Sequence, residues 1–313
     1  MTDSATDLLL GNSRLFCFGL GYAARVLAEQ LLSDHRHAGI NVAGTRTRPD
    51  ASDDGLIKLA AFSGDSPGAG VTRLLAGSTH LLISIPPDIE GDPALHCHAS
   101  DLASLSTLRW IGYLSTIGVY GDAGGGTVDE TSPTKPQSER AMSRVTAENQ
   151  WRAFGQQTGK RVEIFRLPGI YGPGRSVIDS LRSGTAKRIV KPGQVFNRVH
   201  VIDIARALET AMALAATGCP SPYDTYNVVD DEPAPPQDVV AYAADLLGMP
   251  PPPEVPFDAA TLSPMARSFY SESKRVSNAR LKSALGFNLA YPTYREGLQA
   301  ILQSEQQPIA LRP

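Results

Sequence analysis

The sequence contains only three cysteines, and their placement argues against a disulfide-bonded framework. Cys17, Cys97 and Cys219 are odd in number, lie far apart and form no CxxC pair. Secreted domains that depend on disulfides carry paired cysteines at closer spacing. The sequence therefore predicts a protein of a reducing compartment, the cytoplasm.

The chain also has neither a large excess of one charge nor a long apolar run. The formal net charge is −3, which provides no basic surface for nucleic acid. No segment approaches the roughly 18 consecutive apolar residues of a membrane helix. Residues 1–7 carry acids but no lysine or arginine, so they lack the charged start of a signal peptide. We expect neither nucleic acid nor a membrane as a partner, and a loosely held tail over residues 1–12.

A set of metal ligands is missing as well. His96, Cys97 and His98 stand together within a predicted helix, but residues two apart on a helix point to different sides. No second cluster supplies the further ligands that a zinc site requires. We therefore expect no metal.

The most informative stretch is RLFCFGLGYAARVLAEQLL, residues 14–32. Its pattern predicts a buried strand that passes through a tight glycine turn into an apolar-periodic helix. Such a turn lets the backbone approach a pyrophosphate, and the first amides of the helix face that group. The sequence thus predicts a dinucleotide site whose contacts are Gly19, Leu20, Gly21, Tyr22 and Ala23.

The end of the second predicted strand lacks an acidic residue. Sites specific for NAD place a carboxylate there to accept a hydrogen bond from the ribose 2′-hydroxyl, whereas a 2′-phosphate favours cations and hydroxyls. This chain offers Thr45, Arg46 and Arg48. An arginine fork matches phosphate geometry, so we expect NADP rather than NAD. A solvated basic loop is the alternative.

Strands and helices alternate along most of the chain. Apolar runs predict further strands near 40–44, 56–62, 80–85, 110–114, 162–167 and 226–229. Helical patterns fall near 94–105, 140–157, 203–216 and 235–247. This alternation predicts an α/β chain with a Rossmann-type doubly wound parallel sheet, which binds its ligand at the carboxyl ends of the strands.

The expected organisation is a core with a small substrate lobe. The core covers 12–172 and is completed by 196–229, the lobe comprises 173–195 and 230–290, and a C-terminal helix and tail occupy 291–313. Asp203 is expected to cap a helix, and Thr293 with Glu296 forms a capping-box pattern for the last one. The proline-rich residues 249–256 predict an extended connector.

Motifs along nearly the whole chain resemble a known family. They are GLGYAA at 19–24, LSTIGVYGD at 114–122, FRLPGIYGPGR at 165–175, RVHVIDIARAL at 198–208 and YNVVDDEP at 226–233. In this order they resemble the extended short-chain dehydrogenase/reductases of the NAD-dependent epimerase/dehydratase group, most closely an atypical branch. The glycine motif departs from the family, because its spacing is GxGxxA instead of GxxGxxG.

The resemblance implies a catalytic group that this chain has altered. The family has a Ser/Thr after the fifth strand, a tyrosine that exchanges a proton with substrate, and a lysine four residues later that holds the ribose. Thr116, beside Ser115, takes the Ser/Thr place. Arg140 and Arg144 stand where the family has tyrosine and lysine. Arginine stays protonated, so Arg140 cannot move the proton, while Arg144 could still hold the ribose.

Two interpretations follow from this replacement. In an active enzyme, Tyr120, Tyr171 or Glu139 would move the proton, and Arg140 with Arg144 would grip an anionic group of the substrate. The alternative for the two arginines is a solvated helix face, paired with Glu139 and Glu148. In the other interpretation the chain is a non-catalytic NADP-binding sensor or scaffold. A hydrolase using Ser115 is a remote third option, because the chain lacks the GxSxG elbow there.

The resemblance also implies the remaining contacts. Pro168 and Gly169 would lie at the nicotinamide, and Ser84, Ile85 and Pro86 beside the adenosine. The positions expected at the substrate are Tyr171, Arg175, Arg198 and His200. We expect NADP-dependent redox chemistry on a hydroxyl or keto group of a small, anionic or sugar-like substrate, carried out by a monomer or homodimer.

Overall fold

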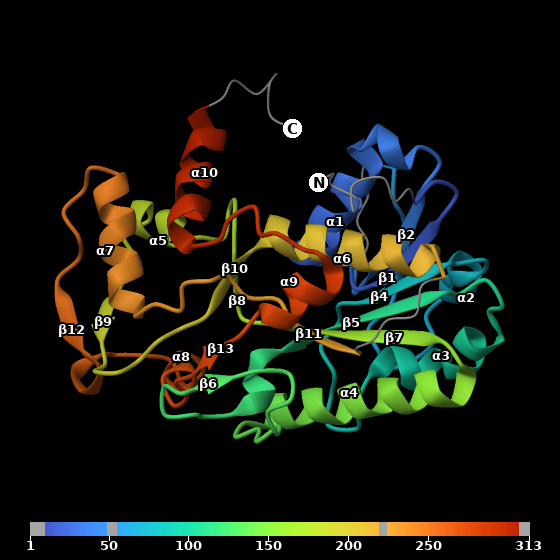
Figure 1. Cartoon of the computed structure of the whole chain (residues 1–313), viewed down its shortest axis with the longest axis horizontal. Helices are drawn as coiled ribbons and strands as arrows, with labels where there is room; N and C mark the ends of the chain where they lie inside the picture. Colours follow the sequence, from blue (N-terminus) through green and yellow to red (C-terminus); the bar gives the residue numbers. More distant parts are fainter. Residues whose placement is uncertain (1–9, 49–54, 219–223, 307–313) are drawn as a thin grey trace.

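The centre of the molecule is a seven-stranded parallel sheet, shown in Figure 1 as a computed structural model that describes residues 10–48, 55–218 and 224–306. Its strands, in spatial order, are β11 (Thr225–Asn227), β7 (Arg161–Leu167), β5 (Trp110–Thr116), β4 (His80–Ile83), β1 (Arg14–Phe18), β2 (Asn41–Arg46) and β3 (Lys58–Ala61). The chain changes direction across the sheet between β1 and β4. This is the doubly wound arrangement that the sequence predicted, with its ligand crevice at the switch point.

Helices cover both faces of the sheet. One face carries α1 (Tyr22–Ser33), α6 (Val201–Ala216) and α9 (Ala279–Leu285), and the other carries α2 (Val71–Leu75), α3 (Pro93–Ser104) and α4 (Glu139–Thr158). Strand β1 explains why both faces are covered, because its side chains alternate between two apolar cores. Leu15 and Cys17 enter the core with α1 and α6, whereas Phe16 and Phe18 enter the core with α4.

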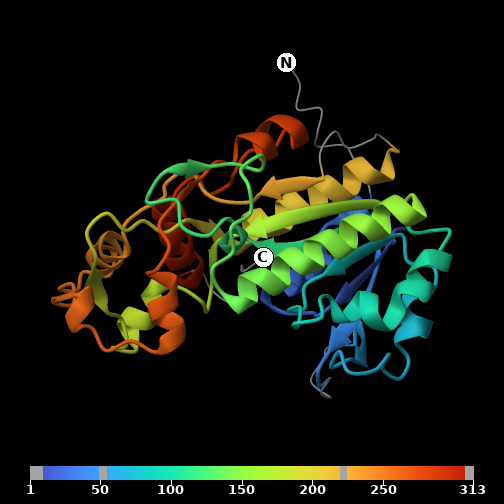
Figure 2. The same ribbon diagram turned by 90° about the horizontal axis from the view of Figure 1, so that it is seen from below.

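A smaller lobe adjoins the sheet at the end to which β7 points (Figure 2). It contains α5 (Val177–Arg182), α7 (Pro236–Leu246), α8 (Pro264–Phe269) and α10 (Tyr294–Gln306). Short parallel pairs accompany these helices: β8 (Gly169–Tyr171) with β10 (Arg198–His200), β9 (Arg188–Val190) with β12 (Glu254–Pro256), and β6 (Thr127–Val128) with β13 (Arg275–Val276). Three 3₁₀ turns complete the list: η1 (His35–His37), η2 (Ile117–Tyr120) and η3 (Phe257–Ala259).

Two local predictions about capping had different outcomes. The capping box is confirmed for one of its two bonds: Thr293 N donates to Glu296 Oε2 at 3.0 Å, whereas Thr293 Oγ1 accepts from Arg295 N at 3.1 Å, one residue before the expected donor. The predicted cap Asp203 is wrong, because His200 caps α6 and accepts from Ile202 N. Asp203 instead accepts from two amides of the segment between α9 and α10, Ala290 N at 2.7 Å and Tyr291 N at 3.0 Å.

The expected loose tail over 1–12 is wrong at its end. Leu10 is fully buried, and its amide donates to His37 Nδ1 at 3.2 Å; residues 1–9 lie outside the described ranges. The proline-rich connector differs as well, because its last residues pair with β9 as β12. Among the described residues, no helix has both the length and the apolar character that a membrane span requires.

Candidate functional site

The glycine turn after β1 is held open by the neighbouring strand. Gly19 has a φ of 85° and its amide donates to Thr45 Oγ1 at 2.9 Å, while Leu20 N donates to Thr45 O at 2.8 Å. Gly21 is the N-cap of α1, no side chain caps this end, and no atom lies within 4 Å of where its Cβ would stand. The first amides of the helix therefore face open space, a fit to the pyrophosphate of a dinucleotide.

The sequence placed Thr45 among the ribose contacts, but the structure gives its hydroxyl a partner in the protein. Its side chain is fully buried, and its hydroxyl is used to hold Gly19. Arg46, half-buried, ends β2, and Arg48 is exposed two residues later. Thr45 thus supplies a structural hydroxyl, and Arg46 and Arg48 are the charged residues at the end of the described part of this segment, residues 41–48.

The segment after β4 lies against the same turn. Ser84 N donates to Phe18 O at 2.8 Å, so the backbone continues along the end of β1. The Cγ2 atom of Ile85 would be only 2.7 Å from a Cβ at Gly19. Glycine is thus required at position 19 both by its φ and by the close approach of Ile85. Pro86 follows and is exposed.

Ser115 belongs to a buried polar cluster and is not an accessible nucleophile. Its hydroxyl donates to Glu148 Oε1 at 2.6 Å. Glu148 also accepts from both sides of the Arg166 guanidinium, from Nε at 3.0 Å and Nη2 at 2.7 Å. This geometry speaks against the hydrolase option. Thr116, the next residue, is half-buried at the end of β5, and its Oγ1 accepts from Gly118 N at 3.1 Å.

The tyrosines considered for proton transfer have their hydroxyls engaged elsewhere. Tyr120 is buried; its hydroxyl accepts from Arg166 Nη1 at 2.9 Å and donates to Asn227 Oδ1 at 2.7 Å. The hydroxyl of Tyr171 packs tightly against Gly297 of α10. Burial raises the pKa of both phenols, so neither releases a proton readily. Glu139, at the start of α4, is exposed.

Arg140 and Arg144 do not form the anion clamp that their spacing suggested. Nη1 of Arg144 donates to Leu114 O at 2.7 Å and to the hydroxyl of Tyr113 at 3.2 Å, so this guanidinium is bound to β5. Arg140 is exposed one turn earlier on α4. Four residues of spacing brought the two arginines to one helix face, but tertiary contacts oriented Arg144 toward the sheet.

A cavity of about 550 Å³ in the lobe gathers other cations instead. Arg175, Lys187 and Arg198 line it, together with the predicted substrate residue Tyr171 and the predicted nicotinamide contact Gly169. The acid on its wall, Asp179, is already engaged by the amide and hydroxyl of Ser176. Apolar side chains complete the lining: Ile170, Val177, Ala186 and Val240. The cavity suits a compact anion with an apolar part.

Arg198 and His200, both predicted at the substrate, differ in their position, because only Arg198 lines this cavity. Arg198 is half-buried and donates to Phe196 O at 2.9 Å and Ala234 O at 3.2 Å, which fixes its position in the wall. His200 is buried behind Tyr171, with their ring centroids 5.2 Å apart. Burial lowers the pKa of His200 to about 4, so its imidazole is neutral and acts as a helix cap. Pro168, half-buried, precedes Gly169 at the edge of this wall.

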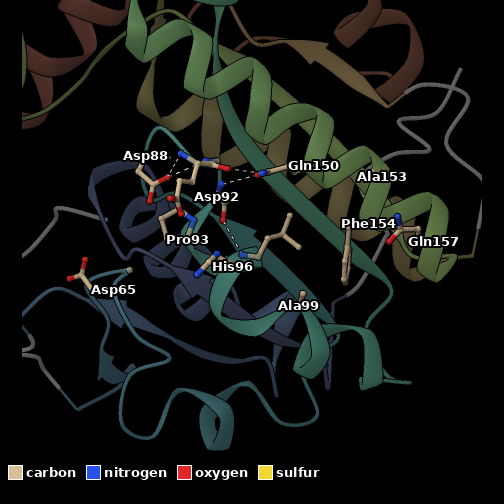
Figure 3. Close-up of a pocket in the computed structure, with 14 residues that line it drawn as sticks. Asp65, Asp88, Asp92, Pro93, His96, Ala99, Gln150, Ala153, Phe154 and Gln157 are labelled. Carbon is tan, nitrogen blue, oxygen red and sulfur yellow. Dashed lines mark hydrogen bonds between the residues drawn. The ribbon is translucent and has the colours of Figure 1, made fainter.

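A second cavity, of about 580 Å³, lies between α3 and α4 (Figure 3). Four carboxylates line it: Asp65, Asp88, Glu90 and Asp92. Gln150 on α4 ties the loop before α3 to the helix by accepting from Asp92 N at 2.9 Å and donating to Glu90 O at 2.8 Å. This negative lining disfavours the phosphates of a dinucleotide.

His98 and His37 have structural partners. His98 is buried between Asp101 Oδ2, 2.9 Å from its Nδ1, and Pro67 O, 2.8 Å from its Nε2. Asp34, His37 and Glu209 also converge. His37 accepts from Leu10 N through Nδ1, so its Nε2 carries the proton and donates to Glu209 at 2.8 Å. Arg36 supplies the cation for the two acids.

Sequence reasoning missed two features of this region. Lys187 lies in a stretch with no motif, and only the fold brings it beside Arg175 and Arg198. The Glu148–Arg166 pair was missed although it carried a signal, because Arg166 is a charged residue between the apolar Phe165 and Leu167 of a predicted buried strand. A charge at such a position requires a buried partner.

Comparison with known proteins agrees with this geometry. The model of the "NAD dependent epimerase/dehydratase family" matches residues 99–228. A functionally unknown conserved protein from Silicibacter pomeroyi DSS has a similar structure, with 46% identity, a TM-score of 0.82, and coverage of 94% of this chain and 100% of that one. MoeE5, solved with UDP-glucuronic acid and NAD, is 20% identical with a TM-score of 0.72, covering 93% and 98% of the two chains.

A curated relative extends the comparison to a reductase. The 3-diazoavenalumate denitrifying reductase of Streptomyces sp is 30% identical over 148 residues, 43% of this chain and 45% of that protein. This chain therefore matches about half the length of that relative. The family model therefore places residues 99–228 in the NAD dependent epimerase/dehydratase family, and the Rossmann sheet is the fold shared with the similar solved structures.

Proposed function

We propose that this protein binds NADP(H) at the glycine turn and carries out redox chemistry on a small anionic substrate held in the lobe cavity. One observation carries the proposal: the uncapped start of α1 and the cation-lined cavity are adjacent. Tyr22, the first residue of α1, donates from its hydroxyl to Pro173 O at 3.0 Å, and the neighbouring Arg175 lines the cavity. Cofactor and substrate sites next to each other are what hydride transfer requires.

The preference for NADP rests on the end of β2. Residues 41–48 contain Arg46 and Arg48 but no carboxylate that could accept from a ribose 2′-hydroxyl. Two guanidinium groups can bind a 2′-phosphate through several charge-assisted hydrogen bonds. Thr45 supports this site indirectly by holding the turn at Gly19.

The chemistry follows from what the chain can and cannot supply. Bound NADP(H) would donate or accept a hydride. Thr116 keeps a hydroxyl hydrogen at the end of β5 that can donate to a substrate oxygen, because its Oγ1 acts as acceptor toward Gly118. Since Tyr120 and Tyr171 are engaged, the arrangement favours a reduction in which the proton comes from solvent. The similarity of part of the chain to a protein named as a reductase is consistent with a reduction.

A non-catalytic NADP-binding protein is the second candidate. The observation that favours it is the pair Arg140 and Arg144, which replaces the tyrosine and lysine of the family, with Arg144 bound to β5. In this case the cavity would bind a regulatory anion instead of a substrate.

Titration and turnover together test these proposals. We expect calorimetry to give tighter binding of NADPH than of NADH. The near-ultraviolet absorbance of NADPH should then fall with at least one member of a panel of aromatic carboxylates and nucleotide sugars. Arg175→Ala should raise the KM for that compound, whereas Arg182→Ala, an exposed arginine paired with Glu305 at 2.7 Å, should not. Tight NADPH binding without any turnover would favour the sensor, and absence of nucleotide binding would refute both.

A further inference from the structure

A tight turn carries Arg175 into the wall of the lobe cavity. Gly172 and Arg175 exchange backbone hydrogen bonds, Gly172 N to Arg175 O at 3.2 Å and Arg175 N to Gly172 O at 3.0 Å. Pro173 occupies the second position, and Gly174, with a φ of 69°, the third. This is the residue pattern of a type II turn. The placement of Arg175 therefore depends on how this turn, residues 172–175, is held.

Tyr22, the first residue of α1, contacts this turn. Its hydroxyl donates to Pro173 O at 3.0 Å, and the Arg175 guanidinium carbon lies 5.7 Å from the centre of its ring. A Cβ at Gly172 would stand only 2.5 Å from the same hydroxyl, so residue 172 must be glycine for Tyr22 to reach the turn. Tyr22, which lies 151 positions before Pro173 in the sequence, thus contacts both the backbone of the turn and the side chain of Arg175.

We propose that Tyr22 is a positioning residue that couples cofactor binding to anion binding. This inference rests on the proposed function. The Tyr22 amide lies in the first turn of α1, which faces the pyrophosphate, and its side chain contacts the turn with Arg175. Ordering of this helix end by the cofactor also orders Arg175, so the entropy cost of placing the guanidinium is not incurred again when the anion binds.

The coupling is reciprocal and modest. Cofactor must tighten anion binding by the same factor by which anion tightens cofactor binding. One neutral hydrogen bond and one exposed cation–ring contact support a factor of roughly threefold to tenfold. The hydroxyl of Tyr22 is solvent-exposed where it meets Pro173, so its removal should disturb the coupling more than the folding of the chain.

Titrations of two matched variants test the proposal. The probe is cinnamate, an apolar carboxylate, titrated with and without saturating NADPH. In the unmodified protein, NADPH should tighten cinnamate binding by about threefold to tenfold. Tyr22→Phe, which removes the hydroxyl and keeps the ring, should lower this ratio toward one. Tyr242→Phe is the control, because the Tyr242 hydroxyl is likewise hydrogen-bonded, accepting from Gln299 Nε2 at 3.0 Å, and the Arg295 guanidinium carbon lies 4.8 Å from the centre of its ring. It should keep the ratio.

Hydrogen exchange gives a readout that does not need the anion. NADPH should slow amide exchange in the peptide over residues 169–177 in the unmodified protein and in Tyr242→Phe, but not in Tyr22→Phe. If Tyr22→Phe keeps both the ratio and the protection, the proposal is overturned. If cinnamate fails to bind while the protection follows this pattern, the coupling stands and the proposed substrate class is wrong. If NADPH does not bind, both the coupling and the proposed function are wrong.

Discussion

The buried pair Glu148–Arg166 should contribute more to folding than any surface ion pair of this protein. The two side chains are 1% and 4% exposed, and Arg166 donates to both carboxylate oxygens. In Glu148→Gln the guanidinium remains buried without a counter-charge. Breaking such a pair costs about 3–5 kcal/mol of unfolding free energy. The remaining amide oxygen can still accept one bond, so we expect a loss of about 3 kcal/mol.

Urea unfolding followed by tryptophan fluorescence measures this loss. Trp151 lies on α4, within one turn of Glu148, and is fully buried, so its emission reports on the same region. Glu254→Gln is the matched control, because Glu254 pairs with Arg188 at 3.0 Å but is 55% exposed. Exposed pairs contribute at most about 1 kcal/mol. The midpoint of unfolding should therefore shift much further for Glu148→Gln than for Glu254→Gln.

A double-mutant cycle separates the pair from its surroundings. Arg166→Met in the Glu148→Gln background removes the unpaired charge, so the double variant should be more stable than the sum of the single losses predicts, by about 2 kcal/mol or more. The reasoning would be refuted if Glu148→Gln lost less than about 1 kcal/mol, or if the two substitutions were additive.

Three further predictions concern the turn, the ribose and a buried acid. Gly21→Val should weaken NADPH binding at least about tenfold in calorimetry with little change in thermal stability, because its Cβ site is open; a variant that binds normally would contradict the pyrophosphate site. Arg46→Ala should bring the Kd for NADPH close to that for NADH, and an undiminished preference would exclude Arg46 as a phosphate contact. Burial raises the pKa of Asp230 to about 8, so the folded protein keeps a proton that the unfolded chain loses above about pH 4. Stability in urea should therefore fall by a few kcal/mol between about pH 4 and pH 8, and Asp230→Asn should remove this decline; a variant with the same pH dependence would show that another group is responsible.

The sequence by itself determined the local elements around the nucleotide site. An apolar run, a glycine turn and an apolar-periodic helix specify β1 and α1, because side-chain periodicity and glycine geometry act over a few residues. The capping pattern at Thr293 and Glu296 was readable for the same reason, since its partners are three residues apart. Alternation of strands and helices also favoured a parallel sheet, because such strands need crossover helices.

The tertiary structure alone decided which polar group meets which partner. Thr45 turned out to hold Gly19, Arg144 binds the backbone of β5, and Arg166 pairs with Glu148. These contacts join residues far apart in the chain, so no local spacing encodes them. The cation-lined cavity has the same origin, because Arg175 and Lys187 become neighbours only when the lobe folds. Local patterns set the conformation of each segment, whereas the roles of its charged and hydroxyl groups depend on long-range packing, where a buried polar atom must find a partner.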